Sequence, residues 1–146
     1  MRAYHYSNRK HKPGDTITAG RDSIVMLTPS QRAFEDALRA VSIEKTRIRA
    51  ESLYLWEAAD VIKRTWTTIV HAYRFVYEVE VIESEIQHRG DLNVYTHGCS
   101  ASNSSDIKKS VDDYWASRLQ ADQSPRIELL ATKAIVIREI SDPSEF

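Results

Sequence analysis

The sequence predicts an α+β fold, in which strands and helices are mixed along one chain. The predicted order is strand, helix, strand, helix, and then several strands interrupted by one late helix. The C-terminal half is rich in strands, and the strict alternation of a doubly wound parallel sheet is absent. At 146 residues the chain is expected to form a single domain, residues 1–146, that buries about two-thirds of its unfolded surface.

Local composition predicts four segments of the N-terminal half. Residues 2–6 form an apolar run that favours a strand, and residues 7–23 hold Pro and Gly in the pattern of a turn-rich loop. Residues 51–56 predict a second strand, with one tyrosine among leucines. Residues 57–67 predict a helix because apolar side chains recur there at helical spacing.

A start signal predicts one amphipathic helix between these two strands. Thr28 suits the N-cap, Pro29 the first helical position, and Gln31 the position from which a side chain reaches back to the cap. The helix is expected to end by Arg47 or Arg49. Its apolar stripe consists of Phe34, Leu38, Val41 and Ile48.

Three further strands are predicted in the C-terminal half. Residues 75–81 alternate between apolar and polar side chains, which places Glu78 and Glu80 on a solvated face. Residues 126–130 and 133–140 are dense in Ile, Leu and Val and predict the other two strands.

A polar segment separates these strands. Small polar residues over 98–105 predict a loop, and residues 106–119 predict a third helix. Cys99 is the only cysteine, so the chain can form no internal disulfide. Its neighbours His97 and Gly98 do not make the arrangement that activates a nucleophilic thiol.

Composition argues against several classes of protein. The 20 basic and 21 acidic residues leave a net charge of −1, which argues against binding nucleic acid through bulk charge. No apolar run reaches membrane-spanning length and the N-terminus lacks a signal-peptide core, so we expect a cytoplasmic protein with no membrane partner. The five histidines show no metal-ligand spacing, so no metal site is expected. Neither a GxGxxG nor a GxxxxGK[ST] phosphate loop is present.

A series of short pieces, each weak alone, occurs in an ordered sequence along the chain. An N-terminal strand carries a His, and a later strand carries a Tyr and runs into an Ala-rich helix that ends in Trp. The pieces are Tyr4-His5-Tyr6, Lys12-Pro13-Gly14-Asp15, Leu53-Tyr54-Leu55 with the helix to Trp66, Tyr77-Glu78-Val79-Glu80, and Asp91-Leu92-Asn93. In this order they resemble the ADP-ribosyltransferase superfamily, and within it the small bacterial rifampin-type enzymes.

The resemblance implies a split central β-sheet flanked by a few helices, with NAD bound between the two halves. It implies a mono-ADP-ribosyltransferase that cleaves NAD, releases nicotinamide and transfers ADP-ribose to an acceptor. Two segments depart from the rifampin-type pattern, an extra helix over 30–46 and a longer loop and helix over 98–119. Because both would reshape the acceptor side of the cleft, we expect an acceptor other than rifampin.

The resemblance also implies roles for particular side chains. His5, with Tyr6 beside it, is expected to bind the ribose or nicotinamide part of NAD. Tyr54 is expected to stack on the nicotinamide ring. Asp91 or Glu128 is expected to be the catalytic carboxylate, which accepts a hydrogen bond from a ribose hydroxyl and stabilises the oxocarbenium-like transition state.

The choice between the two carboxylates stays open at this point. Asp91 matches the Asp-x-Asn segment, whereas Glu128 matches the more common superfamily pattern of a late glutamate on a strand. Each also has a purely structural interpretation. Glu128 could form a cross-strand ion pair with Lys133 or Arg138, and Asp91 could be an ordinary turn residue after Gly90.

Other functions are compatible with the same fold. The main alternative is a binding module with a degenerate cleft that acts on a partner protein through the two inserted segments. A further alternative is an enzyme that moves a phosphate from an RNA end onto NAD, which would need a cluster of basic residues in the cleft. The resemblance leaves a toxin, a resistance factor and a phage protein open as biological roles.

Overall fold

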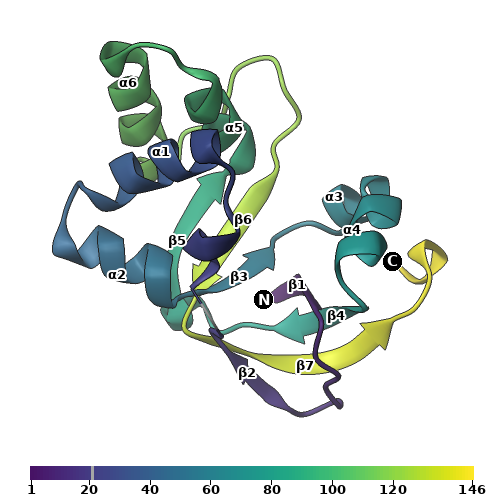
Figure 1. The fold of residues 1–146 in the computed structure, drawn as a ribbon. Helices are drawn as coiled ribbons and strands as arrows, with labels where there is room; N and C mark the ends of the chain where they lie inside the picture. Colours follow the sequence, from purple (N-terminus) through teal and green to yellow (C-terminus); the bar gives the residue numbers. More distant parts are fainter. Residues whose placement is uncertain (21) are drawn as a thin grey trace.

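A computed structural model describes residues 1–20 and 22–146. These residues form a seven-stranded antiparallel sheet in the order β2-β7-β4-β1-β3-β6-β5, with helices beside it (Figure 1). The α+β class predicted from the sequence is therefore confirmed. The strands are β1 (Arg2–Ser7), β2 (Thr16–Thr18), β3 (Leu53–Trp56), β4 (Phe75–Glu80), β5 (Ile86–Asp91), β6 (Ile127–Ala131) and β7 (Lys133–Ile140).

The helices gather in two groups (Figure 1). One group, α1, α2, α5 and α6, lies beside the β5–β6–β3 end of the sheet, and α3 and α4 lie near β1 and the C-terminus. The helices are α1 (Pro29–Arg39), α2 (Ile43–Glu51), α3 (Ala59–Arg64), α4 (Trp66–Ala72), α5 (Leu92–Ser100) and α6 (Ser104–Trp115), with 3-10 turns η1 (Ser23–Met26), η2 (Glu83–Glu85) and η3 (Pro143–Glu145). None of the helices in the described part of the chain is long and apolar enough to cross a membrane.

The predicted start of α1 is confirmed in detail. Thr28 caps the helix, and the side chains of Thr28 and Gln31 make the reciprocal bonds of a capping box. The single long helix expected to follow is wrong, because α1 ends at Arg39 and Ser42 starts α2 by accepting a hydrogen bond from the Lys45 N–H. A local cap thus interrupts a continuous apolar stripe.

Other boundaries also differ from the prediction. The helix predicted over 57–67 is two short helices, α3 and α4. The loop predicted over 98–105 begins inside α5. Neither α5 nor β5 was predicted from the sequence. The predicted loop over 7–23 contains β2 and the start of η1, and its residue 21 lies outside the described residues.

Glu78 corrects the prediction of a solvated face on β4. Its side chain is buried rather than exposed, and it accepts hydrogen bonds from Arg2 at 2.9 Å and Arg138 at 2.7 Å. The alternation of polar and apolar residues correctly identified the strand. It could not show that the side chains of Arg2 and Arg138 shield this carboxylate from solvent.

Among the described residues, most of the buried apolar side chains lie in three clusters. One lies on the sheet, with Leu55, Tyr77 and Leu129 among its members. A second lies between α1, α5 and α6, and a third lies where α3 and α4 pack on the sheet. Gly98 makes the second cluster possible, because a Cβ there would come within 2.2 Å of the Phe34 ring.

The sheet is weakly joined between β1 and β3. Strand β1 pairs with β4 along its whole length, from Arg2 to Ser7, but its register with β3 consists of the pair Tyr4 and Trp56 among the described residues. Beyond that pair the two strands no longer form a ladder. This opening in the sheet positions the candidate site.

Candidate functional site

A cavity of about 530 Å³ lies at the opening between β1 and β3. Four of the five side chains predicted to bind or act on NAD line it, namely His5, Tyr6, Tyr54 and Glu128. Side chains from α1, α2 and α5 complete its walls. The structure therefore brings together residues that are up to 123 positions apart in the sequence.

His5 bridges the two strands with its side chain. Its Nδ1 lies 3.1 Å from the carbonyl oxygen of Tyr54. A carbonyl oxygen can only accept, so Nδ1 carries the proton and Nε2 is left as an acceptor. Burial lowers the pKa of His5 and outweighs the opposing effect of the Tyr54 hydrogen bond, which keeps the imidazole neutral at pH 7.

Two tyrosine rings contribute aromatic surface to the cavity. The Tyr54 hydroxyl donates to the Arg49 carbonyl oxygen at 2.5 Å, which fixes the orientation of its ring. The Tyr6 ring packs against Tyr73, with ring centroids 4.4 Å apart, and lies 6.2 Å from the Trp56 ring. Burial raises the pKa of Tyr6 to about 12, so its phenol is neutral. Flat aromatic ligands can stack on such surfaces.

Glu128 places one carboxylate oxygen in a tight cluster of hydrogen bonds. Oε1 accepts hydrogen bonds from Arg49 Nη1 at 2.8 Å and from the Tyr114 hydroxyl at 2.5 Å. Within the described part of the chain, Oε2 has no hydrogen-bond partner and is not one of the fully buried unpaired atoms. Glu128 pairs with Arg49 rather than with Lys133 or Arg138, the two partners considered from the sequence.

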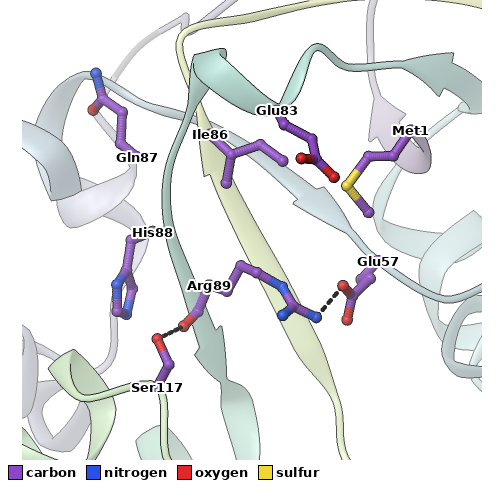
Figure 2. A pocket seen from close by; sticks show the side chains of 8 residues that line it. All are labelled: Met1, Glu57, Glu83, Ile86, Gln87, His88, Arg89 and Ser117. Atoms are coloured by element: carbon purple, nitrogen blue, oxygen red, sulfur yellow. Dashed lines mark hydrogen bonds and ion pairs between the residues drawn. The ribbon is translucent and has the colours of Figure 1, made fainter.

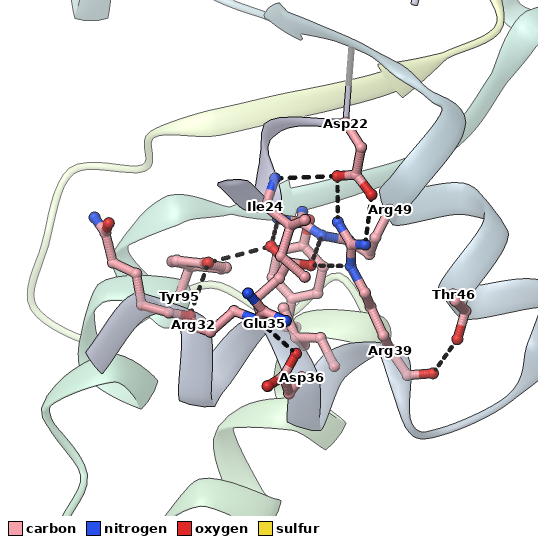
Figure 3. Close-up of polar contacts among 12 residues, drawn as sticks. Asp22, Ile24, Arg32, Glu35, Asp36, Arg39, Thr46, Arg49 and Tyr95 are labelled. Atoms are coloured by element: carbon pink, nitrogen blue, oxygen red, sulfur yellow. Dashed lines mark hydrogen bonds and ion pairs between the residues drawn. The ribbon is translucent and has the colours of Figure 1, made fainter. Parts of the chain in front are cut away.

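A chain of alternating charges extends from Glu128 through Arg49 into the helices, and Figure 3 shows its part from Arg49 to Asp22. Arg49 forms a bidentate pair with Glu35, with N–O distances of 2.8 Å and 2.5 Å. Glu35 also accepts from Arg39, which in turn makes two bonds of 2.9 Å to Asp22. Burial acts to raise the pKa of Glu35, but hydrogen bonds and charges from Arg49 and Arg39 outweigh it and hold that pKa below its usual value.

The charge balance of this cluster has a chemical consequence. Three carboxylates (Asp22, Glu35 and Glu128) meet two guanidinium groups (Arg39 and Arg49), so the described groups of the cluster carry one net negative charge beside the cavity. In a partly desolvated cavity this excess favours a ligand group that is positively charged or becomes so.

Asp91 lies outside the lining of the cavity. Its side chain is 1% exposed and caps α5 by accepting from the Asn93 N–H at 2.9 Å. It also accepts from the backbone N–H groups of Gln120 at 2.9 Å and Arg126 at 3.2 Å. Both carboxylate oxygens are therefore engaged by backbone groups, which ties three segments of chain together.

Sequence analysis missed Glu35, Arg49, Tyr95 and Tyr114 as parts of this site. Glu35 had only a weak signal, because it lies three residues before Leu38 and therefore beside the edge of the apolar stripe of its helix. Arg49, Tyr95 and Tyr114 come from three other segments, and nothing in their local sequence links them to Glu128.

A second hollow of about 510 Å³ lies over β5 at the edge of the sheet (Figure 2). An ion pair between Arg89 and Glu57 crosses it, and the Ser117 hydroxyl donates to the Arg89 carbonyl oxygen at 2.8 Å. None of the five predicted site residues lines this hollow. Among the residues that the structure describes, no group of three or more His, Cys, Asp or Glu side chains is arranged to hold a metal ion.

Comparison with known proteins does not assign the chain to a family. No protein-family model matches the sequence, and no curated protein matches it. The geometry of the cavity is therefore the basis for a functional proposal.

Proposed function

We propose that this chain is an ADP-ribosyltransferase-type enzyme that cleaves NAD in the cavity between β1 and β3. It transfers a single ADP-ribose to an acceptor with a hydroxyl, amine or thiol group, and acts in the cytoplasm. The observation that carries this proposal is that His5, Tyr6, Tyr54 and Glu128, chosen from the sequence for this chemistry, line one cavity.

The arrangement of the sheet supports an ADP-ribosyltransferase-like fold. That fold divides a central sheet in two and binds NAD between the halves. The weak junction between β1 and β3, bridged by the His5 side chain, is a place where this sheet can be so divided. The cavity lies at this junction and is lined by side chains from α1, α2 and α5, and the two groups of helices lie beside different parts of the sheet (Figure 1).

The reaction requires little acid catalysis. The bond between C1′ of the ribose and N1 of the nicotinamide breaks, and the bonding electrons leave with nicotinamide, which becomes neutral. The acceptor atom then forms a bond to C1′ and loses its proton to solvent or a base. The enzyme must hold the nicotinamide ring and stabilise the positive charge that develops on the ribose.

The lining residues suit these tasks. The fixed ring of Tyr54 offers a stacking surface for nicotinamide, worth about 1 kcal/mol beyond its burial. The neutral imidazole of His5 offers Nε2 as an acceptor for a ligand N–H or O–H. Glu128 Oε2 can accept a hydrogen bond from a ribose hydroxyl. The net negative charge of the described groups of its cluster stabilises the positive charge on the oxocarbenium-like ribose.

One observation favours the second candidate, a binding module with a degenerate cleft. Arg49 neutralises Glu128 within a buried cluster of hydrogen bonds, and such ion pairs also occur as purely structural features. In a binding module this cluster would serve the packing of α1, α2 and α6 on the sheet, and NAD would not be cleaved.

The test is release of nicotinamide from NAD by the purified protein. We expect slow release with NAD and an increase in melting temperature at millimolar NAD. NADH is the matched control, because its dihydronicotinamide is not cationic and is a poor leaving group, so we expect no release from it. If NAD gives no nicotinamide release and no increase in melting temperature, the result contradicts the enzyme and favours the binding module.

A further inference from the structure

Tyr114 can reach Glu128 because the residue opposite Glu128 on β5 is a glycine, Gly90. Gly90 is in register with Glu128, and a Cβ on Gly90 would lie 2.3 Å from the Tyr114 ring. The absence of a side chain at Gly90 thus leaves space for the ring, which α6 projects across β5. The hydroxyl then meets Glu128 Oε1 at 2.5 Å.

The direction of the Tyr114 hydrogen bond is determined by Arg49. Arg49 Nη1 lies 2.7 Å from the Tyr114 oxygen and can only donate to it. The Tyr114 hydroxyl therefore accepts a hydrogen bond from Arg49 and donates one to Glu128 Oε1. Glu35 holds the other edge of the guanidinium in a bidentate pair, so Arg49 cannot turn away from this contact without breaking two further bonds.

We propose that Tyr114 and Arg49 are positioning residues that saturate Oε1 of Glu128 and leave Oε2 as the only carboxylate oxygen offered to the ribose. This inference rests on the proposed function, because it concerns how the same carboxylate is aimed. Two donors on one oxygen keep the carboxylate from rotating about its final bond. A single fixed acceptor then meets the ribose hydroxyl without reorganisation during bond breaking.

A matched pair of tyrosine variants tests the proposal. Tyr114→Phe removes the donor to Glu128 and keeps the ring over Gly90, whereas Tyr77→Phe removes a buried tyrosine hydroxyl on β4 that donates to the Arg9 carbonyl oxygen at 3.2 Å and lies outside the cavity lining. We expect Tyr114→Phe to lower kcat about tenfold with KM unchanged, because a bond that positions the carboxylate acts mainly in the transition state. Tyr77→Phe should change kcat less than about twofold, because its hydroxyl does not contact the cavity.

A second measurement does not depend on NAD. Among the described residues, Tyr114 and Arg49 are the two side chains that donate to Oε1 of Glu128. Loss of the Tyr114 hydrogen bond should change the carboxyl ¹³C chemical shift of Glu128 at pH 7 in Tyr114→Phe relative to the wild type. We expect no such change in Tyr77→Phe.

The outcomes separate this inference from the function on which it rests. Absence of NAD cleavage by the wild-type protein would contradict the proposed function, whatever the ¹³C signal does. Cleavage by the wild type together with equal kcat in both tyrosine variants would overturn the positioning role. An unchanged carboxyl ¹³C chemical shift of Glu128 in Tyr114→Phe would overturn it as well.

Discussion

Two of the buried carboxylates of this molecule, those of Asp91 and Glu128, lie in different regions and are bonded differently. At the junction of β5 and α5, Asp91 accepts three backbone N–H groups through both of its oxygens. At the cavity, Glu128 concentrates its partners on Oε1 and leaves Oε2 free among the described residues. Both side chains are buried, so burial alone does not distinguish them.

The difference lies in whether any acceptor capacity remains. A carboxylate whose oxygens are all engaged by backbone groups holds segments of chain together, and a ligand could reach it only by breaking those bonds. A carboxylate held by one oxygen is oriented and still able to bind. This contrast is the reason for preferring Glu128 over Asp91 as the acid of the proposed reaction.

The largest effect is expected from Glu128→Gln. The amide oxygen can still accept from Arg49 and Tyr114, so the fold should persist. The negative charge beside the ribose is lost, and we expect kcat for nicotinamide release to fall by about 100-fold or more. Glu139→Gln on β7 controls for loss of an acid elsewhere and should retain activity. Full activity in Glu128→Gln would show that the Glu128 carboxylate has no catalytic role.

The next largest effect is a dependence of stability on pH near the β5–α5 junction. Burial lowers the pKa of His88 on β5 to about 4, although its hydrogen bond to the Tyr114 carbonyl opposes the shift. Unfolded histidine binds its proton near pH 6.5, so the unfolded state gains protons first as the pH falls. The free energy of unfolding should therefore decrease between pH 6.5 and 4, by up to about 3 kcal/mol from this group.

Comparison of pH profiles checks this expectation. Urea unfolding of His88→Gln should show a smaller decrease over the same pH range than the wild type. His97→Gln, at an exposed position on α5, is the control and should keep the wild-type profile. Equal slopes in wild type and His88→Gln would show that His88 is not responsible.

The smallest of these effects is expected from Asp91→Asn. One oxygen becomes an amide that cannot accept, so a buried backbone N–H loses its partner and stability should fall by about 2 kcal/mol. Activity per folded molecule should remain. Asp36→Asn on the exposed surface of α1 should cost less than about 0.5 kcal/mol. If Asp91→Asn abolished turnover without lowering stability, Asp91 rather than Glu128 would be the catalytic carboxylate.

Local signals predicted those elements whose bonding partners lie nearby in the sequence. The capping box of α1 joins residues three positions apart, and the prediction of it was correct. The solvated face assigned to Glu78 was wrong, because its partners Arg2 and Arg138 are 76 and 60 positions away. The same limit applied to Glu128, whose partner Arg49 is 79 positions away.

The sequence by itself determined the α+β class, most of the strands and the start of α1, and it suggested the side chains that the proposal assigns to NAD. Only the tertiary structure decided that His5, Tyr54 and Glu128 meet at an opening in the sheet while Asp91 does not. The physical reason is that caps and strand periodicity arise from neighbouring residues. The partner of a buried charge, by contrast, depends on which distant strands and helices pack together.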